Sequence, residues 1–557
     1  MPPTSLSRGR RSRALTPLTP DTRPRLATGV AFEPTADDAV WIAVLHGVPS
    51  SRVSRAVVAL LRAMDGETAL RELHGRFAAS EPWESFLPLI ERFRASGLFE
   101  GQTTRPPGRL SYRPPFTVQI ATLRAPALFR RLDRLIVSLS RRTVMVALVV
   151  VLVLGALAAL LQRHELHDVL IAPMSLSGLV VLVVVLSLIT LLHEGAHGLT
   201  LTRFGGRPRR AGVMLFYLTP AFFVDVTDGW RLPDRRHRVA VALAGPAVHA
   251  VVAALALLAA LVLRHPPLRE TLLLLALSCA AIVVLNLIPF VRFDGYIALM
   301  SALDEPNLRG RTIRDGADFV TRLLFGGPPT RPALTTWWSV PFGLASLLTP
   351  VVLVLFAVAR IARALAGGGP VLGLLVVALE AAVALVGVAL VAGALHRVLR
   401  SGVSRVRFVS VGIALVAGVV LAGSVIPMPV AATYGFVVDG DRVLLVRGGG
   451  EVDRTVPEGA PVVLLSNGIL ANGQVGEGTV QPQRAEPTTV PVDALFPVKA
   501  DGVTISATIV ARVDLLGPSA ELPPTGQARV EFGTRNLWQT LWTTGVVLPL
   551  SGRQDEK

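Results

Sequence analysis

The sequence contains very little cysteine and lysine. Its single cysteine, Cys279, lies inside an apolar run, which excludes a disulfide framework and a thiolate metal site, so any metal must be bound by histidine and carboxylate. Only Lys499 and Lys557 are lysines, and the formal net charge of +16 therefore comes almost entirely from arginine. The arginines gather beside apolar runs, as a positive-inside bias predicts. Membrane topology explains them better than nucleic acid, and we expect no nucleic-acid partner.

Charged residues are also scarce, at 17% of the 557 residues, whereas hydrophobic residues make up 51% and the mean hydropathy is +0.55. A water-soluble surface could not easily carry this balance, so the lipid bilayer is expected to solvate most of the protein. The first apolar stretch long enough to cross a bilayer begins well over a hundred residues into the chain. We therefore expect no cleavable signal peptide and a cytoplasmic N-terminal part.

Apolar runs of spanning length, roughly 20 residues each, recur along the rest of the chain. With the N-terminus inside, about seven spans place the C-terminus outside and most arginine-rich stretches on the cytoplasmic side. The sequence thus predicts a polytopic α-helical protein of the cell membrane. The runs lie near 143–162, 174–192, 239–263, 271–291, 344–365, 371–395 and 405–427.

The two ends of the chain have the patterns of soluble segments. Residues 1–22 are rich in Arg, Ser, Thr and Pro, which predicts a disordered tail. Residues 23–101 contain a short apolar stretch and three amphipathic helical patterns, the second with Thr68 as N-cap, and predict a small α+β, winged-helix-like domain. Short β-branched runs between Gly and Pro turns predict an extracytoplasmic β-rich domain at 428–557.

Two connections between the apolar runs contain polar residues that need an interpretation. The connection 204–238 carries Gly and Pro around an apolar stretch, which predicts a hairpin or a re-entrant element at the membrane face. Its Asp225 and Asp228 are expected to be solvated loop acids. His164 and His167, three apart in the outer connection, are expected to lie in a loop away from any metal site.

The segment His193-Glu194-Gly195-Ala196-His197 carries the clearest chemical signal. Histidines four apart on a helix project from one face and can bind one tetrahedral metal, with the glutamate beside its open position. Zinc would activate a bound water and polarise the scissile carbonyl, while Glu194 would take the water's proton and deliver one to the leaving amine. A helix with two surface histidines is the alternative. It is disfavoured because the motif ends an apolar run, where three ionisable side chains are costly.

A zinc site with two histidines still lacks a third protein ligand, and Asp294 is the candidate. It lies 97 positions after His197, where another apolar run ends, and the predicted topology brings both helix ends to the cytoplasmic side. The alternative for an Asp-Gly pair after a helix is simply a turn. We predict one Zn²⁺ bound by His193, His197 and Asp294.

These motifs, in this order, resemble the site-2 protease family of intramembrane zinc metallopeptidases. The matching features are HExxH at 193–197, Ala244-Gly245-Pro246 within the third span, and Asn286-x-x-Pro289 leading to Asp294-Gly295. The resemblance covers about 170–312. It implies an intramembrane zinc peptidase core at 143–312, followed by additional transmembrane helices at 313–427.

Two finer expectations follow from this resemblance. The segments 224–233 and 305–308 are most similar to the branch of peptide zinc metalloproteases. Asn286 corresponds to a family asparagine near the substrate strand, which implies that it orients substrate or stabilises the oxyanion during catalysis. The alternative is a buried asparagine that satisfies unwound backbone beside Pro289.

The soluble ends suggest a substrate class. Residues 59–73 resemble PqqD-like peptide-binding domains, which implies that 23–101 binds a leader peptide at a sheet edge; a domain of this shape without a peptide partner is the alternative. Residues 456–463 and 525–532 resemble adaptor proteins of export systems, which implies an adaptor-like domain at 428–557 and a peptide exporter as partner.

Together, the resemblances imply a zinc metalloendopeptidase that removes the leader from a ribosomally made precursor peptide, such as a daptide precursor, before export. One alternative is a site-2-type protease that cleaves a membrane-bound regulator. The other is a non-catalytic export or immunity adaptor. Structural zinc normally has four protein ligands and needs no neighbouring glutamate, which argues against the adaptor.

Overall fold

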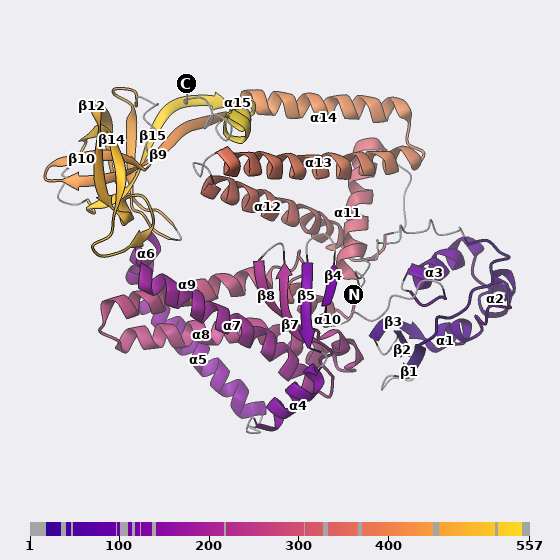
Figure 1. The fold of residues 1–557 in the computed structure, drawn as a ribbon. Coiled ribbons are helices and arrows are strands. Elements are labelled where there is room, and N and C mark those ends of the chain that lie inside the picture. The colour runs from indigo at the N-terminus through magenta and orange to yellow at the C-terminus, as the bar shows by residue number, and fades with distance from the viewer. Residues whose placement is uncertain are drawn as a thin grey trace, which may run out of the picture. The chain divides into compact units, whose positions relative to one another are not determined.

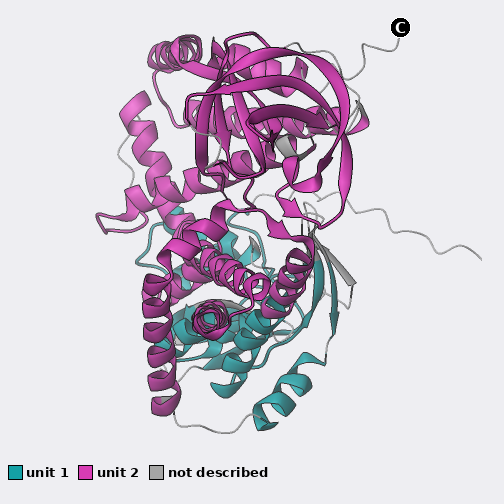
Figure 2. Ribbon diagram, turned by 90° about the vertical axis from the view of Figure 1, so that its left-hand side faces the viewer, with its two compact units in different colours: residues 1–138, 190–245 teal, residues 139–189, 246–557 magenta. Residues whose placement is uncertain are grey.

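The structure is a computed structural model (Figure 1) with two compact units, residues 1–138 with 190–245 and residues 139–189 with 246–557 (Figure 2). Of the predicted tail, residues 1–17 lie outside the described residues. The structure describes residues 18–34, 40–45, 48–95, 97–100, 110–113, 117–122, 124–135, 141–216, 219–305, 307–326, 332–365, 370–448, 456–469, 471–517 and 522–547.

In these ranges, seven helices are long and apolar enough to cross a membrane, which confirms the prediction of a polytopic membrane protein. Half of the apolar stretch of α8 is buried by other parts of the protein, against only 6% in α13 and in α14. The bilayer must therefore solvate most of α13 and α14. The seven are α5 (Arg141–Leu161), α7 (Leu176–Arg203), α8 (Arg235–Val262), α9 (Pro266–Leu287), α12 (Ser339–Leu365), α13 (Pro370–Arg400) and α14 (Arg405–Val425).

Small residues bring α5 and α8 into close contact. A Cβ atom added to Gly155 of α5 would lie 2.4 Å from the Cβ of Ala254 in α8, so the two backbones touch where neither carries a large side chain. Gln162, just after α5, donates from Nε2 to the carbonyl of Leu257 at 3.1 Å. In a bilayer, such close packing and buried hydrogen bonds replace the hydrophobic effect as the source of helix association.

The first soluble domain contains a three-stranded antiparallel sheet in the order β1 (Val30–Pro34), β2 (Val40–Leu45) and β3 (Val48–Ser54). Three helices follow, and their buried leucines and isoleucine share one core with β2 and β3. The small β/α domain is confirmed, while its winged-helix-like arrangement stays a prediction. The helices are α1 (Arg55–Arg62), α2 (Leu70–Phe77) and α3 (Trp83–Ala95).

The turn between α1 and α2 depends on the carboxylate of Asp65. Its Oδ1 accepts hydrogen bonds from the backbone N–H groups of Thr68 at 2.9 Å and Glu67 at 2.8 Å. The predicted N-cap at Thr68 is wrong: the N-cap of α2 is Ala69, because Asp65 also engages the Thr68 hydroxyl. The bond from the Thr68 backbone, then that from Glu67, holds the pKa of Asp65 below its ordinary value.

Replacing Asp65 with alanine is expected to loosen this turn at neutral pH. The folded pKa lies below the unfolded value of about 3.9, so the contribution to stability is present above that value and is lost as pH falls through the folded pKa. Hydrogen exchange over residues 65–77 of the full-length protein should be faster in Asp65→Ala than in wild type at neutral pH, but not in strong acid. Glu67→Ala removes an exposed carboxylate and keeps the backbone bond; equally fast exchange in that control would contradict the assignment.

A second antiparallel sheet has the order β4-β5-β7-β8, and its β7–β8 pair is the predicted hairpin between the second and third spans. Gln119 and Ala121 of β5 are buried, whereas Ile120 and its partner Val213 on β7 are 62% and 45% exposed. The outward face of the sheet is therefore apolar, as a membrane face requires. The elements are β4 (Leu110–Arg113), β5 (Thr117–Thr122), β7 (Ala211–Phe216), β8 (Thr219–Val224), the short helix η1 (Thr227–Arg231), and α4 (Ala125–Leu135), which follows β5.

The C-terminal β-rich domain is a closed barrel in the order β10-β14-β12-β11-β15-β9. Closure leaves no open sheet edge, and Phe436, Leu464 and Val530 are among the side chains that fill the interior. The strands are β9 (Pro427–Asp439), β10 (Arg442–Gly448), β11 (Pro461–Leu465), β12 (Gln474–Pro491), β14 (Thr504–Leu515) and β15 (Thr525–Asn536), with η2 (Val492–Ala494) and β13 (Val498–Lys499) between them and α15 (Leu537–Trp542) and η4 (Thr543–Val547) after them.

The barrel is attached to the membrane helices in two places. The Ala471 N–H donates to the carbonyl of Leu170 in α6 (Arg163–Ile171) at 3.2 Å, and β13 pairs in parallel with β6 (Met174–Ser175). Trp538 of α15 donates from its indole nitrogen to the carbonyl of Val420 in α14 at 3.1 Å. The predicted loop around His164 and His167 is therefore wrong, because these residues form α6, a helix that carries the barrel.

Candidate metal centre

The two histidines of the HExxH segment lie on α7 with their Nε2 atoms 3.2 Å apart. Two nitrogen ligands of one tetrahedral zinc, each about 2.0–2.1 Å from the metal, would be about 3.3 Å apart. The rings meet edge to face, with 4.9 Å between their centroids. His193 and His197 are only 7% and 5% exposed. The pair thus presents two nitrogens at zinc-ligand spacing in a buried place.

A backbone carbonyl of α8 orients the second histidine. His197 Nδ1 lies 2.7 Å from the carbonyl oxygen of Val241 and donates to it in the neutral ring, since that oxygen can only accept. This bond fixes the tautomer, so Nε2 carries the lone pair toward His193. Histidine ligands of metals almost always have such a partner on the other nitrogen.

Glu194 is tied to the sheet that adjoins α7. Its Oε2 accepts a hydrogen bond from the backbone N–H of Val224, the last residue of β8, at 3.1 Å. Because β8 is an edge strand with β7 on its other side, this N–H points out of the sheet. The carboxylate beside His193 is therefore held by a backbone group, which restricts its position before any substrate binds.

Gly245 provides the space in which the histidines meet. A Cβ atom at this position of α8 would lie 2.4 Å from Nε2 of His197 and 2.5 Å from Nε2 of His193. No real Cβ contact is that short, so the backbone of α8 forms a wall of the site and no side chain fits there. The Gly-Pro break noted in the sequence thus has a steric reason.

Asp294, at the start of α10 (Asp294–Ala302), completes the cluster. The ligand atoms of His193, His197 and Asp294 all lie within 4.8 Å of one another, and no other group of this kind occurs in the described part of the chain. Two imidazoles and one carboxylate form a donor set typical of catalytic zinc, in which a fourth position is left to water or substrate. The residues therefore fit a zinc ion.

An arginine that the sequence analysis did not single out supports the turn before Asp294. Arg309, in α11 (Leu308–Phe325), donates from Nε to the carbonyl of Phe290 at 3.2 Å and from a terminal nitrogen to that of Ser346 in α12 at 3.0 Å. Burial lowers the pKa of the Arg309 guanidinium below its ordinary value, and the charge of Arg292 lowers it further. Only the fold places residues 290, 309 and 346 together, so no sequence pattern marks this role.

Two further polar residues, Asn286 and His249, lie on the spanning helices α9 and α8. Asn286 is partly buried in the last turn of α9, eight positions before Asp294, and its contribution to oxyanion binding stays a prediction. His249, one turn after Gly245 on α8, is 1% exposed and is not part of the metal-binding group.

The expectation of solvated loop acids is wrong for Asp228. This side chain is 3% exposed and accepts hydrogen bonds from Arg231 at 2.9 Å and from the backbone N–H of Arg207 at 2.9 Å. Arg231 also pairs with Glu33 of β1 at 2.9 Å. Asp228 is buried because the guanidinium groups of Arg209, at 3.4 Å, and Arg231 come from the two sides of the hairpin and offset its desolvation. It organises the loop after β8 and joins it to the first domain.

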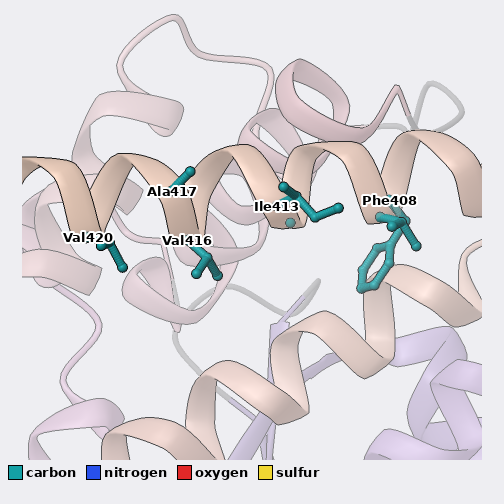
Figure 3. A pocket seen from close by; sticks show the side chains of 7 residues that line it. Phe408, Ile413, Val416, Ala417 and Val420 are labelled. Atoms are coloured by element: carbon teal, nitrogen blue, oxygen red, sulfur yellow. The ribbon is translucent and has the colours of Figure 1, made fainter.

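An apolar groove on α14 has none of the chemistry of the metal centre. It has a volume of about 450 Å³ and is lined by residues of one helix (Figure 3). All of these side chains are hydrocarbon, so the groove offers no donor, acceptor or titratable group. On a helix that is almost wholly exposed to lipid, acyl chains are its natural contents. The lining residues are Phe408, Val409, Gly412, Ile413, Val416, Ala417 and Val420.

Comparison with known proteins finds one informative similarity. The protein named "Putative zinc metalloprotease Rip2" of Mycobacterium tuberculosis is 32% identical to this chain over an alignment of 235 residues that covers 36% of this chain and 83% of that protein. No family model matches the chain. No solved structure matches it either.

Proposed function

Because this chain belongs to the site-2 protease-like family of zinc metalloproteases, we propose that it hydrolyses peptide bonds within the membrane, with Glu194 as general base. The observation that carries the proposal is the His193, His197 and Asp294 cluster, in which both histidines lie on the spanning helix α7 beside that glutamate. When bound there, zinc supplies a Lewis acid that lowers the pKa of a water and polarises a carbonyl.

The residues of this chain have separable roles in that reaction. The carbonyl of Val241 keeps the proton of His197 on Nδ1, so that Nε2 remains a ligand. Glu194 takes a proton from the attacking water at its carboxylate and later delivers one to the leaving amine. The Val224 N–H holds the carboxylate in place for both transfers. Asn286 is proposed to orient the substrate or to stabilise the oxyanion from the end of α9.

The edge strand β8 supports an extended peptide as substrate. A peptide that adds to an exposed sheet edge gains main-chain hydrogen bonds without depending on its side chains. The last residue of β8 already donates to Glu194, so a strand paired along β8 would pass the catalytic carboxylate. A soluble protease could use such an edge in water; here the exposed Ile120 and Val213 favour a membrane setting.

The connections of α7 support the proposed topology. The first domain contacts η1, which follows α7, through Glu33 and Arg231, whereas the barrel is attached to α6 and β6, which precede α7. A helix that crosses the bilayer has its two ends on opposite faces. We place the first domain in the cytoplasm and the barrel outside, in agreement with the arginine-rich connections on the first domain's side.

The substrate is proposed to be a ribosomally made precursor peptide, daptide-like or related, whose leader binds the first domain. The support is the small sheet of that domain, with its edge strands, and the ion-pair chain from Glu33 through Arg231 to Asp228. These ion pairs join the proposed leader-binding domain to the loop after β8, which lies next to the proposed substrate strand. The barrel would then act as an adaptor toward a peptide exporter, on the outer side.

Deletion of the gene is expected to make an uncut precursor accumulate. Mass spectrometry of the membrane fraction should show a small peptide that retains its leader, and re-expression of the full chain should restore the mature form. Accumulation of an uncut membrane-bound regulator instead would contradict the leader proposal while supporting the peptidase. A strain with no uncut protein of either kind would contradict the peptidase itself.

A further inference from the structure

The amphipathic helix α4 lies along the last turns of the metal-bearing helix α7. Ala125 and Phe129 of α4 are 0% and 4% exposed, and a Cβ added to Gly198 of α7 would lie 2.5 Å from the Phe129 ring. Asp133 accepts from Arg203, at the end of α7, at 3.0 Å. One side of α4 is therefore fixed to the helix that carries the histidines, next to His197.

A second side of α4 exposes three leucines. Leu128, Leu132 and Leu135 are 47%, 39% and 78% exposed, and their spacing of four and three residues puts them in one row on the helix. In α7, Leu191 and Leu192 are similarly exposed, at 45% and 60%, one to two turns before Gly198. Since α7 spans the membrane, its exposed leucines face lipid. The leucine row of α4 therefore needs an apolar surrounding at the adjacent end of that span.

The third side of α4 is strongly basic. At 100° per residue, Arg130 and Arg134 point away from the leucine row, Arg131 lies between Arg134 and that row, and all three are exposed. Asp133, the acidic residue of the helix, is already paired with Arg203. The exposed charge of α4 is thus entirely positive. Only five residues separate its end from the start of α5, the first span.

We propose that α4 is an in-plane membrane helix that binds anionic phospholipid. The leucine row enters the acyl boundary, while Arg130, Arg131 and Arg134 bind the phosphates of the headgroup layer. Leucines on one face and arginines on the other are the pattern of helices that lie in the interface. The positive face is complementary to anionic headgroups rather than to zwitterionic ones. Contact of Phe129 with Gly198 couples this lipid surface to the metal-bearing helix.

Lipid quenching of a fluorophore tests the placement. In full-length protein with Cys279→Ser, a bimane label is attached at Leu132→Cys or, as the matched control on the arginine side, at Ala127→Cys. The protein is placed in phosphatidylcholine nanodiscs that contain a small fraction of brominated phosphatidylglycerol or brominated phosphatidylcholine. The label at 132 should be quenched by both lipids, more strongly by the glycerol lipid, and that at 127 much less. No quenching at 132 by either lipid would overturn the proposal, because protein or water would then cover the leucine row.

The charge requirement is tested in the same discs. A triple variant should lose the preference for phosphatidylglycerol; it carries Arg130→Gln, Arg131→Gln and Arg134→Gln. At low salt, each arginine is expected to raise the affinity for the anionic lipid about fivefold. The corresponding lysine variant should retain it, which separates loss of charge from loss of folding. Equal quenching by the two lipids in the wild-type helix, or a preference that survives the glutamine variant, would overturn anionic recognition.

Discussion

Glu194→Gln is expected to lower the rate of peptide hydrolysis by about 10²- to 10⁴-fold while leaving zinc bound. The substitution preserves the size of the side chain and an oxygen that can accept from the Val224 N–H at the 3.1 Å seen for the carboxylate. It removes the group that takes the proton from water. Because the proposed zinc ligands are His193, His197 and Asp294, the metal content should not change. The comparison needs kcat from a peptide cleavage assay and zinc by mass spectrometry of the same preparation.

The control for this substitution is Glu165→Gln. Glu165 lies on α6, the helix that carries the barrel, and pairs with Arg269 near the start of α9. It has no role in the proposed reaction. Its replacement should change kcat by less than about twofold, as for most surface substitutions. If the Glu194→Gln protein cleaves at the wild-type rate, Glu194 is not the general base. Loss of zinc from that protein would instead show a role in metal binding.

Gly245→Ala is expected to weaken zinc binding strongly. The added Cβ would lie 2.4 Å from Nε2 of His197 and 2.5 Å from that of His193, so at least one ring must move away from its ligand position. Since outer-shell changes alone reduce metal affinity by about 10- to 100-fold, displacement of a ligand should reduce it by at least about 100-fold. Competition with a zinc chelator measures this affinity, and proteolysis should fall to that of the chelator-treated protein.

Gly195→Ala is the matched control, because it adds the same methyl group within two residues of both histidines. Nothing lies within 4 Å of a Cβ at this position of α7. Alanine also favours helix over glycine by about 0.5–1 kcal/mol, so this variant should bind zinc normally and be at least as stable as the wild type. Equal zinc affinity in the two alanine variants would show that α8 does not form the wall of the site.

The fold was predictable where its cause is local. Each of the seven spans is visible in the sequence because a spanning helix satisfies its own backbone and needs only a continuous apolar run. Two short strands of the first domain, β1 and β3, and the helix at His164 were missed. Their signals are weak, and β1 and β3 form only by pairing with β2, whereas α6 is held by the barrel and by Arg269.

The residues of the metal centre were likewise predictable only where their sequence signal is local. The HExxH spacing and the apolar run before it pointed to His193, Glu194 and His197, and a second run end pointed to Asp294. The sequence did not show that Asp228 is buried, since its burial depends on the guanidinium groups of Arg209 and Arg231, which only the folded hairpin brings together. Nor did it show the support that Arg309 provides to the turn before Asp294.

The sequence by itself determined that the chain is a multi-pass membrane protein with a candidate HExxH zinc site and β-rich C-terminal part. These are properties of composition and short-range periodicity. Tertiary structure decided that Val224 holds the glutamate, that Gly245 leaves room for two imidazoles, and that six strands close into a barrel. Each of these depends on backbone groups or distant segments that meet only after folding, and neither a backbone N–H nor a missing Cβ has a chemical signature in the sequence.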